Sequence, residues 1–298
     1  MTLFKDIGLL VKTAKAEEPL SRHTSFRIGG PAEVMVWPES FKELEDVRDM
    51  CKNRGIPLTV LGDGTNVLAP DAGLRGVVLS TNRLNTITFL QDNKVSAQAG
   101  AKTGKLANLT AKAGLQGLAF AAGIPGTIGG AVYMNAGAYG GEMKDVCESV
   151  SLLTDEGILE KTASEMGFGY RTSIAQQGGM LVLGAVFALS PGVPKQIREE
   201  IIEFNKRRRN TQPVEFPSAG SAFKRPEGYF VGKLVQDSGL RGFSVGGAMV
   251  SEKHTGFIIN TGGATAKDVL ELIEAVRARV NELFGVMLEP EVRLLGGL

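Results

Sequence analysis

The chain has 298 residues, of which 43% are hydrophobic and 22% are charged, and its formal net charge is +1. This length allows a large core divided over two or more units, and the near-neutral charge argues against nucleic acid or an anionic membrane as the main partner. Cys51 and Cys147 lack the spacing of a metal site or a disulfide framework, which predicts no bound metal and a reducing compartment.

The sequence shows no membrane or secretion signal. Its N-terminus lacks a basic region followed by a continuous apolar core, so it does not resemble a secretion signal. No apolar run approaches the ~18 residues that a spanning helix needs. We therefore expect a cytoplasmic protein without membrane insertion, and we favour a monomer.

The first predicted elements are a helix, a strand, a second helix and another strand. Apolar residues recur at helical spacing over 3–11, and Ala32–Trp37 has the composition of a strand. Ser40 with Glu43 forms a capping box, which predicts the start of the second helix. Pro57–Leu61 predicts a strand that runs directly into a glycine loop.

Two short glycine loops resemble nucleotide-binding motifs without matching them. Gly62–Asn66 is not followed by the third glycine of the dinucleotide fingerprint or by a helical pattern. Gly100–Lys105 is one residue too short for a P-loop, and Leu106 stands where that motif has its magnesium-binding Ser or Thr. The sequence thus argues against a Rossmann fold and against ATP, and Thr103 is instead expected to cap a helix.

The longest glycine-rich segment, Ala121–Glu142, holds seven glycines and no Lys, Arg or Asp. Apolar residues such as Ile128 and Val132 interrupt it, unlike a flexible linker, which is rich in Ser and charge. Bare backbone amides in an ordered segment bind anions, and a diphosphate is a common large one. The pattern predicts a cofactor loop, while a tight turn packed under a strand is the alternative that composition leaves open.

Strands dominate the middle of the chain and do not alternate strictly with helices. This favours an α+β fold over a doubly wound parallel sheet. Short strands are expected at 76–79, 86–89, 94–97, 146–154, 158–161 and 180–189, with a turn at Asp155–Gly157.

The last third predicts a long helix followed by a smaller α/β unit. The helix opens at Pro194 and ends in the basic run Lys206–Arg209, which suits a helix C-terminus; a contact to nucleotide phosphates is the alternative. An irregular boundary follows at Thr211–Pro226. Beyond it we expect a helix at 229–238, strands at 243–250 and 257–260, a helix capped by Thr265 and Asp268, and a closing strand at 289–295.

Five segments, in this order and at these separations, resemble the UDP-N-acetylenolpyruvylglucosamine reductase family, bacterial enzymes that make UDP-N-acetylmuramate for peptidoglycan. They are Gly62–Asn66, Gly123–Tyr139, Gly169–Arg171, Ser218–Lys224 and Glu289–Arg293. The resemblance extends from Ser21 to Gly296, nearly the whole chain. Each segment alone is weak, but the five together are specific.

The resemblance implies an α+β fold with an FAD-binding domain of the p-cresol methylhydroxylase or vanillyl-alcohol oxidase type, built from two α/β subdomains, and a smaller α/β substrate-binding domain. It divides the chain into an N-terminal helical extension at 1–20, the FAD-binding domain at 21–195, the substrate-binding domain at 205–286 and a C-terminal strand at 287–298. It also implies bound FAD, NADPH as co-substrate and UDP-N-acetylglucosamine-enolpyruvate as substrate.

The same resemblance places the FAD diphosphate and flavin against two glycine segments. Both offer unhindered amides, which agrees with the reading of their composition. The implied cofactor-binding residues are Gly62, Asp63, Gly64, Thr65, Asn66, Gly123, Ile124, Pro125, Gly126, Thr127, Gly129, Gly130, Asn135, Ala136 and Gly137.

Three residues are implied to be catalytic. Arg171 would hold the substrate carboxylate, Glu291 would hydrogen-bond the same group if protonated, and Ser221 would protonate C2. Glu289 is the less favoured acidic residue, because Glu291 precedes Val-Arg as the family motif requires. From the residues alone, Arg171 could pair with a surface carboxylate, Ser221 could belong to a turn, and Glu291 could be a solvated strand end.

Four further residues are candidate substrate contacts: Tyr170, Lys224, Lys233 and His254. A structural role is the alternative for His254, and His23 is not assigned to the site. No tyrosine occurs between Arg171 and the helix at Pro194, so the chain resembles the shorter class of the family, which lacks a tyrosine-bearing insertion.

Two other functions are weighed against the NADPH-dependent reductase. An FAD-dependent oxidase or dehydrogenase of the same fold would act on another substrate and would have no use for the Ser221 and Glu291 motifs. A catalytically silent nucleotide-binding protein would purify without bound flavin.

Overall fold

The computed structural model describes residues 3–297. Met1, Thr2 and Leu298, which fall in the expected N-terminal extension and C-terminal strand, lie outside the described residues. The chain divides into two compact units. The first comprises the segment up to Lys15 with Met35–Asp63 and Val78–Arg207, and the second comprises Ala16–Val34, Gly64–Val77 and the segment from Arg208 onward.

The first unit contains most of the strands. Its helices are α1 (Leu3–Ile7), α2 (Phe41–Asn53), α3 (Thr103–Lys112) and α4 (Ile128–Tyr133), with short 3₁₀ turns at Ala119–Ala121, Met143–Asp145 and Ile174–Gln176. Its strands are β3 (Leu58–Leu61), β6 (Ile87–Phe89), β7 (Lys94–Gln98), β8 (Leu115–Gln116), β9 (Gly137–Ala138), β10 (Gly141–Glu142), β11 (Cys147–Thr154), β12 (Gly157–Thr162), β13 (Leu181–Ala188) and β14 (Ser190–Pro191).

A five-stranded sheet with the order β12-β11-β13-β7-β6 forms the centre of this unit. Its neighbouring strands are all antiparallel. The turn expected at Asp155–Gly157 is present, since Thr154 pairs with Gly157 across the β11–β12 hairpin. Antiparallel pairing confirms the α+β class over a doubly wound parallel sheet.

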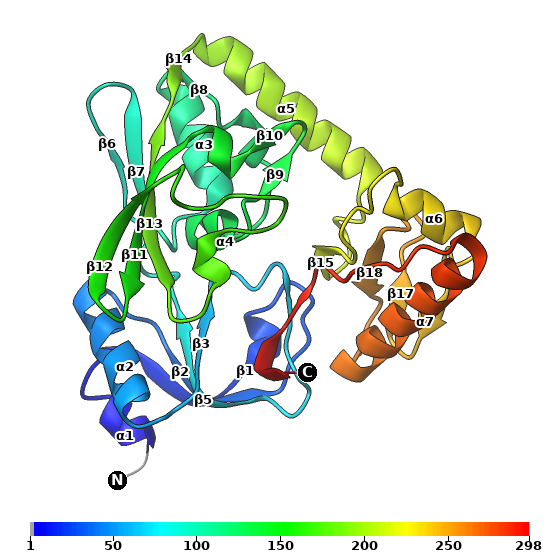
Figure 1. The fold of residues 1–298 in the computed structure, drawn as a ribbon, viewed down its shortest axis with the longest axis horizontal. Helices are drawn as coiled ribbons and strands as arrows, with labels where there is room; N and C mark the ends of the chain where they lie inside the picture. Colours follow the sequence, from blue (N-terminus) through cyan, green and yellow to red (C-terminus); the bar gives the residue numbers. More distant parts are fainter. Residues whose placement is uncertain (1–2, 298) are drawn as a thin grey trace. The chain divides into compact units, whose positions relative to one another are not determined.

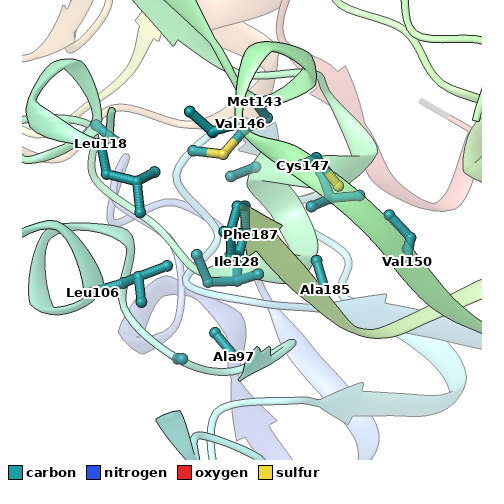
Figure 2. Close-up of a cluster of buried hydrophobic side chains, with 14 of the residues drawn as sticks. Ala97, Leu106, Leu118, Ile128, Met143, Val146, Cys147, Val150, Ala185 and Phe187 are labelled. Carbon is teal, nitrogen blue, oxygen red and sulfur yellow. The ribbon is translucent and has the colours of Figure 1, made fainter. Parts of the chain in front are cut away.

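The core of the first unit lies between this sheet and helices α3 and α4 (Figure 1). Figure 2 shows Phe187 of β13 in the middle of the core, with Ile128 of α4 beside it and Met143 nearby. All three side chains are fully buried. Deleting a buried aromatic ring of this kind costs about 3–5 kcal/mol, so the start of α4 is held firmly against the sheet.

The second unit is a smaller α/β unit. Its four-stranded sheet has the order β15-β18-β17-β16, and one face carries the long helix α7, whose apolar stripe includes the buried Val269, Leu272 and Val276 (Figure 1). Its elements are a 3₁₀ turn at Leu20–Arg22, β4 (Val67–Leu68), β15 (Ser218–Ser221), α6 (Val231–Asp237), β16 (Ser244–Val245), β17 (Ala248–Val250), β18 (Phe257–Asn260), α7 (Ala266–Phe284), β19 (Arg293–Leu294) and a 3₁₀ turn at Leu295–Gly297.

Some elements cross the division between the units. They are β1 (Ala14–Pro19), β2 (Pro31–Val36), β5 (Leu74–Ser80) and α5 (Pro194–Thr211). Together with β3, these strands form a four-stranded sheet with the order β1-β2-β5-β3.

The predicted helix caps are mostly confirmed. Thr265 and Asp268 form both halves of a capping box at α7, and Ser40 accepts a hydrogen bond from the backbone of Glu43 at α2. Thr103 was expected to cap α3, but this is wrong: Lys102 is the cap residue and Thr103 is the first residue of the helix. Lys102 takes this place because its backbone pairs with that of Thr127.

The expected closing strand at 289–295 is wrong over most of its length. Regular pairing is limited to β19, which runs parallel to β4. Before it, Pro290 makes an isolated bridge with Phe223, and Glu291 bonds to Ala222. This stretch pairs briefly with one segment and then with another, so no long strand forms.

Cys51 and Cys147 are both free thiols, and both are buried in the first unit. Burial raises the pKa of Cys51 to about 11 and that of Cys147, with help from Glu148, to about 12. Among residues 3–297, no helix is long and apolar enough to cross a membrane.

Candidate functional site

The start of α4 in the first unit carries an unpartnered polar group. Thr127 caps the helix and is only 2% exposed, and its Oγ1 has no hydrogen-bond partner among the described residues. This hydroxyl faces Gly62, where an added Cβ would lie 2.4 Å from Oγ1. A buried unpaired hydroxyl costs about 1–3 kcal/mol, so the arrangement points to a partner outside the chain.

Basic and small residues surround this hydroxyl. Lys102 forms an ion pair with Asp63 and pairs by its backbone with Thr127. Gly130 is exposed, and an added Cβ there would meet no atom nearer than Thr127 Oγ1 at 3.8 Å. Backbone amides, a hydroxyl and a lysine suit an anion such as a diphosphate. The residues present therefore fit the diphosphate of a dinucleotide cofactor.

The rest of the expected cofactor residues in this unit flank α4. Gly123, Ile124, Pro125 and Gly126 precede the helix, and the carbonyl of Gly126 accepts hydrogen bonds from the backbone and the side chain of Thr103 at 3.1 and 3.2 Å. Gly129 lies inside the helix, where an added Cβ would come within 2.9 Å of Ala99 Cβ. Close packing thus explains why residue 129 is glycine. At Gly130, by contrast, the absence of a side chain leaves the helix surface open.

Asn135, beyond the other end of α4, connects the glycine segment to the loop of Arg171. It is 1% exposed, and its Nδ2 donates to Glu142 Oε2 and to the carbonyl of Gly169, both at 2.9 Å. Its Oδ1 accepts from the backbone of Lys144 at 3.0 Å. Lys144 is also the largest cause of the lowered pKa of Glu142, ahead of the hydrogen bond from Asn135 and the charge of Arg171.

Arg171 itself has an unusual backbone. Its φ is +56°, and its guanidinium carbon lies 5.2 Å from the ring centroid of Tyr170. A non-glycine residue in this region costs about 1–3 kcal/mol and persists when its surroundings determine it. Gln176 Nε2 donates to the Arg171 carbonyl at 2.9 Å. The sequence did not identify Gln176 as a functional residue, because nothing in the sequence distinguishes it from the neighbouring, exposed Gln177.

Ala136 and Gly137 lead into the hairpin of β9 and β10. The backbone of Ala136 bonds to Ala131 and Met143, and a side chain at Gly137 would collide with Glu142. The hairpin tip residue Tyr139 stacks on Phe204 of α5 at 4.5 Å, and Arg207 lies over the Tyr139 ring. This part of the basic run Lys206–Arg209 therefore packs against the first unit's glycine segment.

In the second unit, Gly64 is held by the segment before β2. Its φ is +61°, and an added Cβ would lie 2.2 Å from the carbonyl oxygen of His23. The Gly64 carbonyl accepts from the backbone and the hydroxyl of Ser25 at 3.0 and 3.3 Å. Thr65 and Asn66 follow in the turn before β4. Close approach of backbones explains why glycine is required at Gly64.

The structure brings the segments of Ser221 and Glu291 together in the second unit. The backbone N–H of Glu291 donates to the carbonyl of Ala222 at 2.9 Å, and Lys224 N–H donates to the carbonyl of Glu289 at 2.8 Å. Asn66 joins them, since its Nδ2 donates to the Glu291 carbonyl at 3.2 Å. The Lys224 side chain forms an ion pair with the exposed Glu289 carboxylate.

His254 lies near the same segment, whereas the side chain of Lys233 turns to its own helix. Ser221 pairs in register with Phe257, whose ring contacts His254 edge-on at 4.9 Å. Burial lowers the pKa of His254, and its Nδ1 accepts from Gly256 N–H at 3.1 Å. Lys233 is exposed and pairs with Asp237 one helical turn on.

Among residues 3–297, no group of three or more candidate ligands could hold a metal ion.

Two family models match separate parts of the chain. Residues 32–163 match a model described as an FAD binding domain, and residues 212–295 match the C-terminal domain of UDP-N-acetylenolpyruvoylglucosamine reductase. Together with the antiparallel sheets, these matches confirm the expected fold class, an FAD-binding domain with a smaller second domain.

Curated proteins and a solved structure are similar over nearly the whole chain. UDP-N-acetylenolpyruvoylglucosamine reductase of Lachnoclostridium phytofermentans is 51% identical over 99% of this chain and 97% of that protein. The enzyme of the same name from Caldanaerobacter subterraneus subsp. tengcongensis is 49% identical over 94% of this chain and 92% of its own length. The crystal structure of the Thermus caldophilus enzyme is 35% identical, with a TM-score of 0.81 over 95% of this chain and 98% of that one.

Proposed function

Because the chain belongs to the UDP-N-acetylenolpyruvoylglucosamine reductase family, we propose that it uses NADPH to reduce UDP-N-acetylglucosamine-enolpyruvate to UDP-N-acetylmuramate, a precursor of peptidoglycan. The reaction adds a hydride to C3 and a proton to C2 of the enolpyruvyl double bond, and NADPH leaves as NADP⁺. When bound, FAD supplies the group that carries the hydride from NADPH to the substrate.

In this proposal the glycine segments hold the cofactor, and Arg171 is one of the catalytic residues. The FAD diphosphate is bound by Thr127, Lys102 and the amides of the glycine segments. The unpartnered Thr127 hydroxyl opposite Gly62 supports this placement. Asn135 would help to hold the flavin. The Arg171 guanidinium binds the substrate carboxylate, so that negative charge arising at C2 as the hydride arrives is drawn into that carboxylate.

Ser221 supplies the proton in this proposal, and Glu291 acts beside it. The Ser221 hydroxyl donates its proton to C2 and recovers one from solvent, and Glu291 in its protonated form donates a hydrogen bond to the substrate carboxylate. Tyr170, Lys224, Lys233 and His254 are the proposed substrate contacts. Lys224 would exchange its partner Glu289 for the substrate.

The pairing of the Ser221 and Glu291 segments is the observation that favours a reductase over an oxidase. Ala222 and Glu291 bond directly through their backbones, which keeps a proton donor and an acid together. An oxidase of the same fold removes a hydride from its substrate and has no use for a proton donor at this place. Oxygen consumption with an alcohol substrate, without NADPH, would support that alternative.

Anaerobic stopped-flow absorbance of the purified protein tests the proposal. NADPH should bleach the flavin band, and UDP-N-acetylglucosamine-enolpyruvate should restore it, with a product two hydrogens heavier than the substrate. Absence of bound flavin, or a flavin that NADPH bleaches and the UDP-sugar leaves bleached, would refute the function.

The remaining parts of the proposal concern domains and setting. We keep the domain boundaries 21–195 and 205–286, which overlap the two family-model matches. We place the enzyme in the cytoplasm, consistent with two cysteines that stay free thiols. We take it to act as a monomer, which light scattering would test.

A further inference from the structure

The loop of Arg171 is held by contacts from outside the loop. Its residue Gly169 pairs with Thr172 in an isolated bridge, and Arg171, between them, has a φ of +56°. This left-handed conformation is disfavoured for a residue with a Cβ, so it needs surrounding contacts to persist. The contacts that fix the loop therefore also fix the origin of the guanidinium side chain.

One side-chain amide binds the carbonyl of this strained residue. Gln176 Nε2 donates to the carbonyl oxygens of Arg171 and Tyr133, both at 2.9 Å. A primary amide has two N–H groups, enough for both carbonyls, and Met134 Sδ is a third, more distant acceptor at 3.8 Å. Tyr133 is the last residue of α4, and Ser173 Oγ donates to the same carbonyl at 2.9 Å. Gln176 thus ties the Arg171 loop to the C-terminal end of the helix that Thr127 caps.

The opposite side of the loop has a second attachment. Asn135 Nδ2 donates to the Gly169 carbonyl at 2.9 Å. The loop is therefore held between two amides, one before it in the chain and one after it. Asn135 belongs to the proposed cofactor site, whereas Gln176 lies outside the residues proposed to contact cofactor or substrate.

We propose that Gln176 is a positioning residue for substrate reduction, holding the Arg171 backbone so that its guanidinium meets the substrate carboxylate. The inference rests on the proposed function of Arg171. A displacement of about 1 Å in a group that orients a reacting molecule can lower the rate about 10²-fold. Loss of the Gln176 amide should therefore slow the step that consumes the enolpyruvyl substrate and spare the step that consumes NADPH.

A first experiment tests the attachment without any substrate. Gln176→Leu keeps the size of the side chain and removes both donors, and Gln177→Leu makes the same change at the exposed neighbour. Native-state hydrogen exchange should be about tenfold faster in the peptide covering 169–172 of Gln176→Leu, the loss expected for one hydrogen bond, and unchanged in Gln177→Leu. Unchanged exchange in Gln176→Leu would overturn the inference, whatever the substrate is.

A second experiment separates positioning from general stability. In holoenzyme, Gln176→Leu should slow flavin reoxidation by the UDP-sugar at least about tenfold and leave flavin content and bleaching by NADPH within about twofold. Gln176→Lys keeps N–H donors at similar reach and should restore most of the rate. Equal slowing of both half-reactions, or loss of flavin, would overturn the inference. Gln176→Glu, which keeps the length without the donors, replaces Gln176→Leu if that variant does not fold.

A double-mutant cycle asks whether Gln176 acts through Arg171. Added to Arg171→Ala, the Gln176→Leu change should slow reoxidation by less than about twofold further, because the side chain it positions is already absent. A full additional loss in the double variant would overturn the inference. A wild-type protein that does not reduce the UDP-sugar would refute the proposed function, and with it the role in substrate reduction, while the exchange experiment would still report whether Gln176 holds the Arg171 loop.

Discussion

The backbone N–H of Glu291 donates to the carbonyl of Ala222 at 2.9 Å, one residue after Ser221. The isolated bridge between Phe223 and Pro290 continues this pairing. The proposed proton donor and the proposed acid thus come from distant parts of the sequence and share one short backbone ladder in the second unit. Because the ladder is part of the fold, no ligand is needed to bring the two segments together.

Removal of the Ser221 hydroxyl should separate the two half-reactions. Ser221→Ala is expected to leave flavin bleaching by NADPH nearly unchanged and to slow reoxidation by the UDP-sugar at least ~10²-fold, the lower end for loss of a general acid. Ser244→Ala, at an exposed serine of the same sheet, is the control. Stopped-flow absorbance measures both steps, and equal slowing of the two would exclude Ser221 as the proton donor.

The unpartnered Thr127 hydroxyl should contribute to FAD affinity and not to the stability of the apoprotein. In Thr127→Val the hydroxyl is replaced by a methyl group of similar size, so FAD affinity should fall about tenfold or more, the usual value of a hydrogen bond to a charged group. The melting temperature of the apoprotein should stay the same or rise, because the hydroxyl has no partner there. Circular dichroism and flavin fluorescence give the two values.

Thr127→Ser keeps the hydroxyl and serves as the matched control. Its FAD affinity should lie within about threefold of the wild type. If Thr127→Val binds FAD as tightly as the wild type, the hydroxyl does not contact the cofactor and the proposed diphosphate site is misplaced.

The sequence predicts those features that depend on neighbouring residues. The Thr265 and Asp268 capping box is a contact within one helical turn, and both of its hydrogen bonds are present. By contrast, the start of α3 depends on a bridge between Lys102 and Thr127, a distant residue that spacing along the chain does not reveal. The prediction that Thr103 is the cap was wrong for this reason.

The candidate site divides in the same way. Glycine positions such as Gly64 are readable because only glycine allows the close approach of another backbone, here the His23 carbonyl. Gln176 was not readable, because its role depends on the carbonyl of Tyr133, 43 residues earlier in the chain. That the Thr127 hydroxyl is buried without a hydrogen-bond partner likewise could not be read from the sequence, because it depends on how the folded chain packs.

Both cysteines should resist thiol reagents in the native protein. Burial raises the pKa of Cys51 to about 11 and is the main cause of the value of about 12 for Cys147. Near pH 8 almost no thiolate exists at either position, and thiolate is the reactive form. A colorimetric thiol reagent should label neither cysteine until urea unfolds the chain, and then both. Rapid labelling of either residue in the folded protein would contradict the buried positions.

The pKa of His254 predicts a pH-dependent part of the stability. Burial lowers this pKa from 6.5 in the folded state, so the unfolded chain binds more protons in the window below pH 6.5. The neutral, buried His254 therefore contributes to the free energy of unfolding above pH 6.5. This contribution is lost as the pH falls through the lowered pKa of His254 in the folded state. His254→Gln cannot titrate and should lack this step. Urea unfolding at a series of pH values measures it.

His23→Gln is the control for His254, because the chain has two histidines. His23 approaches Glu18, with its Nε2 2.9 Å from Oε1, whereas the neighbours of His254 are the Phe257 ring and the Gly256 amide. The His23 variant should therefore keep the acid step that His254→Gln removes. A step that survives in His254→Gln with its wild-type size would show that the imidazole of His254 is not the buried group responsible.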